Sequence, residues 1–341
     1  MTNNVQALAP YNGAVLTAGV AGTAVAAAFA LYMLMTEGHA AFNGTSDGVM
    51  WGLPVATYVF FVLTSTGLTL VASLAMVFGV RAFYSVAKRC VWLAVATLIA
   101  GFAALAFELG HPFRMLWALP LSFQITSPMN WMGVLYLAYL FFLLWKFSRM
   151  NAGDWDSPAS RNLGVASFAA VVLAHATLGL VFGMMAMRPF WYDGLIPFYF
   201  LATAALSGVA FAVLASYLAH GFSQAAMPGA LRELMQGAMP KLFAALLGLN
   251  LLLLAARTLT GVWSNYDGMQ AFEWMVASPW FWVEVIAYVL AFFILLSPNL
   301  RSQGNMQLTA SVLVILALFI GRYEYVIGGQ IVPLFKGRVG A

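Results

Sequence analysis

The chain has 341 residues, of which 63% are hydrophobic and only 8% are Asp, Glu, Lys or Arg. A soluble domain carries roughly a quarter charged residues, so this composition and a mean hydropathy of +0.89 exclude the soluble classes. They indicate a polytopic protein of the lipid bilayer. Backbone in lipid must satisfy its own hydrogen bonds, and continuous apolar runs rather than alternating ones favour helices over a barrel. The formal charge of +4 requires no nucleic-acid partner.

The apolar runs predict an all-α protein with about nine transmembrane helices, at about 13–36, 51–79, 86–108, 130–149, 163–187, 195–219, 240–259, 278–298 and 306–330. Residues 1–49 form an extra N-terminal helix and its outer loop, and the other eight spans suit two four-helix bundles. We expect the first bundle within 50–222, and the final helices with an outer C-terminal tail within 223–341. The amphipathic stretch 220–240 is the expected division and predicts a short interfacial helix.

Basic residues set the expected orientation, because cytoplasmic loops of membrane proteins are enriched in Lys and Arg. They concentrate in alternate loops, namely at Arg81, Lys88, Arg89, Lys146, Arg149, Arg161, Arg232, Lys241 and Arg301. The N-terminus is therefore expected in the cytoplasm and the C-terminus in the periplasm of a bacterial inner membrane. The N-terminus lacks a basic region before the first apolar run, so we expect that run to be a retained span.

The stretch FELGHPFRMLW, residues 107–117, gathers an acid, a histidine and a cation where an apolar run ends. Glu108, His111 and Arg114 stand at three-residue spacing. If the helix continues for one more turn, Glu108 and His111 share a face, whereas Pro112 favours a break. One interpretation is an interfacial salt bridge with snorkelling side chains. The other is a proton-handling group beside a lipid-accessible quinone, because a carboxylate and a histidine can accept and relay protons near neutral pH.

Deep ionisable residues form the second candidate cluster: His175, Arg257, Glu284, Arg322 and Glu324. Charges within a membrane span usually face the bundle interior and pair. Pairs of Arg322 with Glu284, or of Arg257 with Glu324, would be neutral and could either fix helix packing or conduct protons. For His175 alone, a satisfied core histidine is the preferred interpretation.

Redox centres within the chain are not expected. The single cysteine, Cys90, cannot supply an iron–sulfur cluster, and no metal site is predicted. Only four histidines are present, and the expected topology puts no two of them at mid-depth, where a b-type haem needs two axial ligands. His39 and His111 are the one conceivable pair, at an exposed interface.

Four stretches resemble the NrfD/PsrC family of membrane subunits, the polysulfide-reductase type, over residues 50–332. They are MWGLPVATYVFFVLTSTGLTLVASLAMVFGV, ELGHPFRMLWALPLSFQITSPMNWMGVLY, RPFWYDGLIPFYFLATAALSG and FIGRYEYVIGGQ. The acidic-Leu-Gly-(Arg/His)-Pro run followed by Ser-Pro-Met-x-Trp is the most specific of these marks. Length, nine spans and an outer C-terminus are also similar to the membrane subunits of tetrathionate reductases.

The resemblance implies a haem-free, quinone-reactive membrane subunit built as two four-helix bundles. Such subunits anchor a ferredoxin-like four-cluster iron–sulfur subunit, which usually connects to a molybdopterin catalytic subunit. Electrons pass between menaquinol or ubiquinol and the clusters. Carried over, Glu108 matches the acidic residue beside the quinone, His111 stands where Arg is more common, and Arg114 matches a basic position. Further expected lining residues of the first bundle are Tyr58, Asn130 and Trp131, with His39 as a substitute for a histidine that some relatives place on the opening helix.

We therefore expect a membrane anchor that oxidises quinol and passes electrons to a docked subunit. Two alternatives remain open at this point. A secondary transporter would use midplane sites on broken helices, such as His175 with Glu284 and Arg322, and would work alone. A purely structural anchor would bind no quinone of its own.

Overall fold

The computed structural model describes residues 13–42, 49–109, 111, 113–264 and 269–331. In this part of the chain nine helices are long and apolar enough to cross a membrane, which confirms the prediction of a multi-pass all-helical protein. The long helices are α1 (Gly13–Glu37), α2 (Leu53–Met76), α3 (Tyr84–Glu108), α5 (Pro128–Asn151), α6 (Pro158–Gly183), α7 (Ile196–Ala219), α9 (Ala238–Trp263), α11 (Pro279–Leu296) and α13 (Gly304–Ile331).

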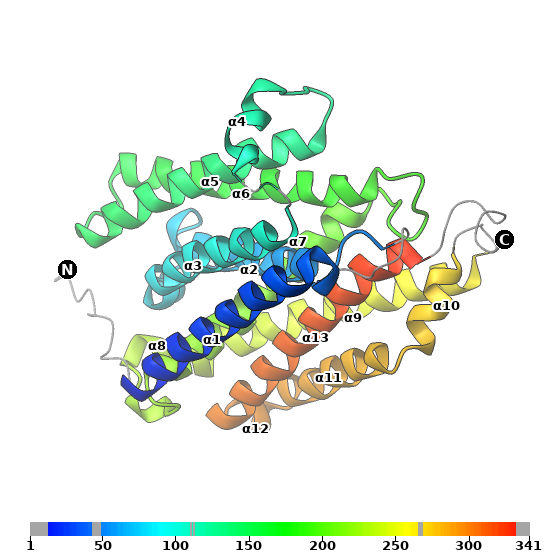
Figure 1. The fold of residues 1–341 in the computed structure, drawn as a ribbon. Helices are drawn as coiled ribbons and strands as arrows, with labels where there is room; N and C mark the ends of the chain where they lie inside the picture. Colours follow the sequence, from blue (N-terminus) through cyan, green and yellow to red (C-terminus); the bar gives the residue numbers. More distant parts are fainter. Residues whose placement is uncertain (1–12, 43–48, 110, 112, 265–268, 332–341) are drawn as a thin grey trace, which may run out of the picture.

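Short helices occupy the connections: η1 (Gly38–Ala41), η2 (Arg81–Phe83), α4 (Arg114–Leu121), η3 (Gln224–Ala226), α8 (Gly229–Gln236), α10 (Gln270–Ala277) and α12 (Pro298–Arg301). The amphipathic helix predicted within 220–240 is confirmed as α8. Neither α4 nor α10 was predicted. We call the end of the molecule that carries η2, α8 and α12 the α8 end, and the opposite end, reached by η1 and α10, the α10 end (Figure 1).

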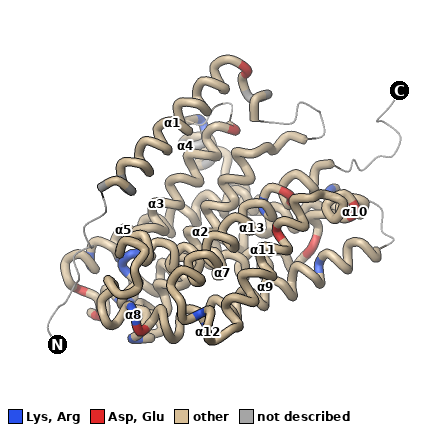
Figure 2. The backbone as a smooth tube through the Cα atoms, turned by 90° about the horizontal axis from the view of Figure 1, so that it is seen from below, with Lys and Arg blue, Asp and Glu red and all other residues tan. Residues whose placement is uncertain are grey.

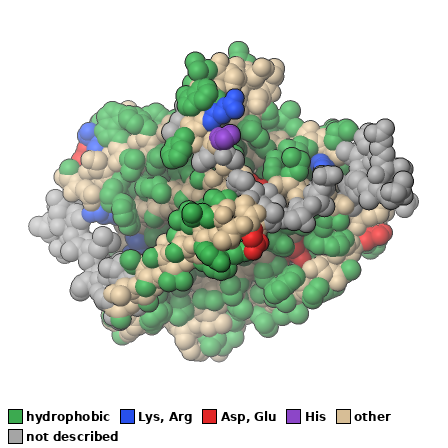
Figure 3. Space-filling model, viewed as in Figure 1, with side chains coloured by type: hydrophobic (Ala, Val, Ile, Leu, Met, Phe, Trp, Pro, Cys, Tyr) green, Lys and Arg blue, Asp and Glu red, His purple; other side chains and the backbone are tan. Residues whose placement is uncertain are grey.

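We call α2, α3, α5 and α6 the first group of long helices, and α7, α9, α11 and α13 the second group. The contacts do not separate these groups cleanly, because α7 packs against α2 more extensively than against α9 or α13, and it also contacts α6, while α13 contacts α2. The expected division between residues 222 and 223 stays a prediction. Helix α1 stands apart, and its stretch Thr17–Glu37 is not buried (Figure 2). Figure 3 shows a face dominated by hydrophobic side chains with few charged ones, as a lipid-facing surface requires.

Helices α2 and α7 touch through their backbones at Gly67 and Gly208. A Cβ added to Gly67 would collide with the Ala204 carbonyl and approach the Gly208 nitrogen to 2.7 Å. Beside this point the hydroxyls of Thr64 and Ser207 are 2.7 Å apart and share a hydrogen bond. Small residues let helices approach closely in lipid, where packing and polar contacts replace the hydrophobic effect.

At the α10 end the side chain of Gln330 ties α13 to the start of α2. Its Oε1 accepts hydrogen bonds from the backbone N–H groups of Met50 and Trp51, both at 2.8 Å. Its Nε2 donates to the Trp51 carbonyl at 2.8 Å. One amide therefore satisfies backbone groups just before α2, where the helix itself supplies no partners.

At the α8 end two polar contacts organise the connection between α5 and α6. Lys146 is buried, and its Nζ donates to Ser160 Oγ at 2.7 Å and to the Trp155 carbonyl at 3.0 Å. Asp154 forms an ion pair with Arg149 and accepts a hydrogen bond from the Ser157 hydroxyl at 2.8 Å. Most Lys and Arg residues gather towards this end (Figure 2).

The glycine contact between α2 and α7 predicts a large effect from a small substitution. Gly208→Ala places a methyl group against the backbone of Gly67 and Leu68, which cannot rotate away. We expect a loss of about 3 kcal/mol of stability, the upper end of the usual cost of overpacking. The measurement is the midpoint of thermal unfolding in detergent.

The matched control is Gly22→Ala in α1, because nothing lies within 4 Å of the added Cβ there. It should leave the midpoint unchanged or slightly raised, since alanine favours a helix over glycine. Equal midpoints for both variants would contradict the close contact.

The Asp154 contacts predict a pH-dependent contribution to stability. Hydrogen bonds from Ser157, followed by the Arg149 contact, lower the pKa of the Asp154 carboxyl below its ordinary value. A carboxyl whose pKa is lower in the folded state stabilises the protein at pH values above its unfolded-state pKa of about 4. This stabilisation is lost as the pH falls through the folded-state pKa. Asp154→Asn should therefore lower the unfolding midpoint at pH 7, and the gap to wild type should shrink progressively below about pH 4. A gap that stays constant between pH 7 and pH 3 would be the contrary result.

Candidate functional site

Glu108 is the last residue of α3, and the chain leaves the helix immediately after it. Leu109 has extended backbone angles, φ −79° and ψ 121°. The structure therefore realises the break rather than the extra turn, and Glu108 and His111 do not share a helical face. Glu108 is half-buried, and both of its carboxylate oxygens are shielded from solvent. An acid is thus held at the end of a membrane helix with its charge-bearing atoms inside the protein.

His111 and Arg114 lie beyond this break and are both exposed. The carbonyl of His111 accepts the backbone N–H of Arg114 at 3.0 Å, where α4 begins. The Arg114 guanidinium carbon is 5.8 Å from the centre of the Trp117 ring. Helix α4 projects from the body of the molecule (Figure 1), so Arg114 is carried on an outlying element.

Tyr58 is a buried residue of α2 that contacts α3 and α5. Its ring centre is 6.0 Å from that of Phe102 on α3, and its hydroxyl is 3.7 Å from the sulfur of Met132 on α5. Phe102 precedes Glu108 by six residues, which is about 9 Å along the helix axis. Tyr58 is therefore buried beside Phe102, which lies about 120° around α3 from Glu108.

Asn130 and Trp131 lie in the first turn of α5, on other sides of the helix than the residue that contacts Tyr58. Trp131 is 40% exposed, and its indole N–H donates to the Ile125 carbonyl at 2.8 Å. Asn130 is half-buried and stands about 200° around the helix from Met132, the residue that touches Tyr58. The structure therefore joins Tyr58 with Met132 rather than with Asn130 or Trp131. His39 falls in the short helix Gly38–Ala41, and its side chain lies outside the described structure.

Three residues of this region were missed from the sequence: Phe102, Met132 and Tyr136. Tyr136 is fully buried, and its ring centre is 6.0 Å from that of Phe102. Met132 and Tyr136 are four residues apart, so they lie on one face of α5. This face contacts Tyr58 of α2 and Phe102 of α3. That spacing was the available signal, but it is also ordinary core spacing and does not single out a site.

The two deep arginines are held by aromatic rings and oxygen atoms. Arg322 hydrogen-bonds to the Thr203 hydroxyl and lies 4.8 Å from the centre of the Phe200 ring. Arg257 donates to the Phe190 carbonyl at 3.0 Å and lies 4.5 Å from that ring. Within the described ranges the ion pair of the structure is the one between Arg149 and Asp154. The predicted pairs, Arg322 with Glu284 and Arg257 with Glu324, were therefore wrong.

His175 is buried on α6 with α2 and α7 on either side. Its Nδ1 is 3.3 Å from the Thr66 hydroxyl, and its ring centre is 6.2 Å from that of Phe200. These contacts agree with a core histidine, but its Nε2 is buried without a hydrogen-bond partner in the described structure, so the prediction that the ring is fully satisfied was wrong. Over the residues that the structure describes, no three His, Cys, Asp or Glu side chains gather as metal ligands.

Comparison with known proteins agrees with the sequence resemblance. The family model described as "Polysulphide reductase, NrfD" matches residues 41–333. Among relatives, the chain is similar to a selenate reductase subunit of Mesobacillus selenatarsenatis, with 26% identity over 92% of this chain and 82% of that protein. It is 25% identical to the Hdr-like menaquinol oxidoreductase integral membrane subunit of Archaeoglobus fulgidus, over 91% of this chain and 78% of the relative.

A third relative is the putative dimethyl sulfoxide reductase membrane subunit of Halobacterium salinarum, with 26% identity over 80% of this chain and 67% of that protein. All three relatives are thus named as subunits of reductases or oxidoreductases, and two of the names place the subunit in the membrane. Because the family model spans most of the sequence, the chain belongs to the NrfD polysulphide reductase family of membrane proteins.

Proposed function

We propose that this protein is the membrane anchor and quinol-oxidising subunit of a respiratory oxidoreductase complex. The observation that carries the proposal is the burial of both Glu108 carboxylate oxygens at the end of the membrane helix α3. A quinol needs a proton acceptor at a hydroxyl and an apolar, aromatic surface for its ring. Glu108 supplies the acceptor, and Tyr58, Phe102 and Met132 supply such surroundings.

The reaction is the two-electron oxidation of menaquinol or ubiquinol. The quinol gives two protons and two electrons and becomes the quinone. Glu108 takes each proton in turn from a quinol hydroxyl, and exposed His111 passes it to water. The electrons leave to an iron–sulfur cluster of a docked subunit, because this chain offers only Cys90 as a thiol ligand.

Arg114 is assigned to the partner rather than to the quinone. Its side chain is exposed and rests on Trp117 of the projecting helix α4. Arginine and tryptophan are residues that protein interfaces favour. We infer that α4 contacts a ferredoxin-like four-cluster iron–sulfur subunit, which in turn serves a molybdopterin catalytic subunit. The names of the relatives support a reductase complex, and one of them names menaquinol.

The proposed orientation places the α8 end in the cytoplasm of a bacterial cell and the α10 end, with α4, in the periplasm. The support is the concentration of Lys and Arg at the α8 end (Figure 2) together with the positive-inside rule. With α1 beginning at the α8 end, the N-terminus is cytoplasmic, and the C-terminus is periplasmic.

The catalytic assignment is tested by Glu108→Gln in the assembled complex. Glutamine keeps the shape but cannot accept a proton, so quinol oxidation should fall about 100-fold or more, the usual contribution of a positioned base. The measurement is quinol-dependent electron transfer in the purified complex, with its full set of subunits verified by mass spectrometry. Glu37→Gln is the matched control, because Glu37 is an exposed acid that also ends a membrane helix.

Two outcomes of this experiment speak against the proposal. Wild-type turnover in Glu108→Gln would mean that quinol is oxidised elsewhere and would favour a purely structural anchor. A protein that purifies alone, without iron–sulfur partner or quinone, would make a secondary transporter the better hypothesis.

The orientation is tested with single cysteines in a Cys90→Ala background, since native Cys90 is fully buried. Ala277 ends α10 and Ser223 follows α7, and both are exposed. Ala277→Cys should react in intact spheroplasts with a membrane-impermeant maleimide, and Ser223→Cys only after lysis. The reverse pattern would invert the proposed topology.

A further inference from the structure

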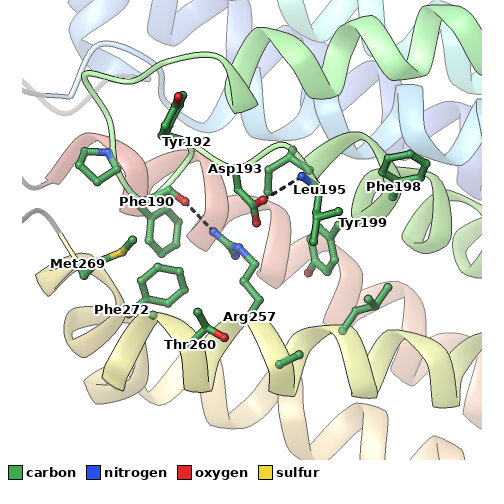
Figure 4. A pocket seen from close by; sticks show the side chains of 15 residues that line it. Phe190, Tyr192, Asp193, Leu195, Phe198, Tyr199, Arg257, Thr260, Met269 and Phe272 are labelled. Atoms are coloured by element: carbon green, nitrogen blue, oxygen red, sulfur yellow. Dashed lines mark hydrogen bonds between the residues drawn. The ribbon is translucent and has the colours of Figure 1, made fainter. Parts of the chain in front are cut away.

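A cavity of about 460 Å³ lies in the second group of helices, remote in sequence from Glu108. It is bounded by the segment that leads into α7, by the last turns of α9 and by α10 (Figure 4). Its lining includes Phe190, Asp193, Tyr199, Arg257 and Phe272. The volume falls within the range of small-molecule sites in proteins.

The rim of the cavity consists of side chains that a membrane protein turns towards lipid. Leu195 and Phe198 are 66% and 69% exposed, and both line the cavity. Ala256 and Thr260 of α9 are exposed on the other side of it. A ligand can therefore enter from the bilayer with an apolar tail left among the acyl chains.

Arg257 provides a positioned donor inside this cavity. Its guanidinium lies 4.5 Å from the Phe190 ring centre, 4.8 Å from Tyr325 and 5.1 Å from Phe272. One N–H group donates to the Phe190 carbonyl. A guanidinium carries five N–H donors, so others are available to a carbonyl acceptor on a ligand.

Asp193 provides an acceptor in the same cavity. Its Oδ1 accepts the Leu195 backbone N–H at 2.9 Å, which fixes the carboxylate near the start of α7. Figure 4 shows Asp193 and Arg257 directed into the same space, and they form no ion pair in the described structure. The negative charge of Asp193 would repel an anionic phosphate group. A neutral ring with oxygen substituents suits both side chains, because Arg257 can donate to the carbonyl of a quinone or the hydroxyl oxygen of a quinol, and Asp193 can accept from a quinol hydroxyl or a bound water.

We propose that this cavity binds the head group of a quinone-class lipid, at a site distinct from the one at Glu108. Arg257 donates to a ring carbonyl, Asp193 accepts from a hydroxyl or bound water, and Phe190, Phe272 and Tyr199 pack against the ring. The proposal concerns binding and assigns no electron transfer to this position. It goes beyond the proposed quinol oxidation, because either site could exist without the other.

The test is photolabelling of the purified complex in phosphatidylcholine nanodiscs with an azido-quinone, followed by peptide mapping. We expect label in 189–199, 253–261 or 269–277 in addition to any label near α3 and α5. Arg257→Gln should reduce this second label roughly tenfold, since a hydrogen bond to a charged group is lost. Label near α3 and α5 should persist, and Arg161→Gln, at an exposed arginine at the α8 end, should change neither.

Thr260→Phe offers a second variant if Arg257→Gln does not assemble. It fills the cavity from its exposed rim and leaves Arg257 and the aromatic rings around it unchanged. It should also remove the second label. Absence of label in the three segments of the wild-type complex would overturn the proposal. So would displacement of the label by phosphatidylglycerol, which would identify an anionic phospholipid as the occupant. Glu108→Gln tests the other site separately, because it should leave the second label in place.

Discussion

Direct contact between the backbones of α2 and α7 at Gly67 and Gly208 is the constraint on which the rest of the structure depends. Helix α7 belongs to the second group of helices, yet it packs against α2 and α6 of the first group. The glycines let these helices meet without intervening side chains, and the hydroxyls of Thr64 and Ser207 fix the register. In lipid such packing and polar contacts are the main source of helix association.

This contact also sets the depth of both candidate sites. Tyr58 precedes Gly67 by nine residues on α2, and Tyr199 precedes Gly208 by nine residues on α7. Both helices run from the α10 end towards the α8 end, so the two tyrosines stand about 13 Å along their axes from one crossing point. Tyr58 faces α3 and α5, whereas Tyr199 faces α9 and α13. A shift of one helix past the other would therefore displace both sites relative to each other.

The nine spans were predictable because each is a long apolar run, and length and hydropathy fix a membrane helix almost without reference to its neighbours. The short helices α4 and α10 were not, because eight mostly apolar residues between two spans do not differ in composition from an interfacial loop. Amphipathicity identified α8, since its charged residues, Arg232 and Glu233, lie on a different face from its apolar residues. The packing of α7 against both groups has no local sequence signal.

The sequence singled out some residues of the candidate sites and not others, for physical reasons that differ by residue. Glu108 stood out because an acid at the end of an apolar run is costly unless it has a role, whereas Met132 and Phe102 have the pattern of any core residue. The sequence paired the deep arginines with acids because residue types reveal opposite charges. They do not reveal which aromatic rings lie beside an arginine in the folded protein. Arg257 has three aromatic rings within 5.1 Å, and the negative faces of such rings attract a cation.

The distribution of charge argues for different roles at the two candidate sites. At the end of α3 the acid is inside, with Glu108 oxygens buried, and the cation Arg114 is outside on α4. An interior proton acceptor is what the proposed oxidation of a quinol requires. In the second cavity the cation Arg257 is the half-buried group, held by aromatic rings, and the exposed carboxylate of Asp193 lines the same space. The two sites therefore differ in which charge is held inside the protein, the acid at the end of α3 and the cation in the cavity, and a single variant at either site tests it without removing the charged group of the other.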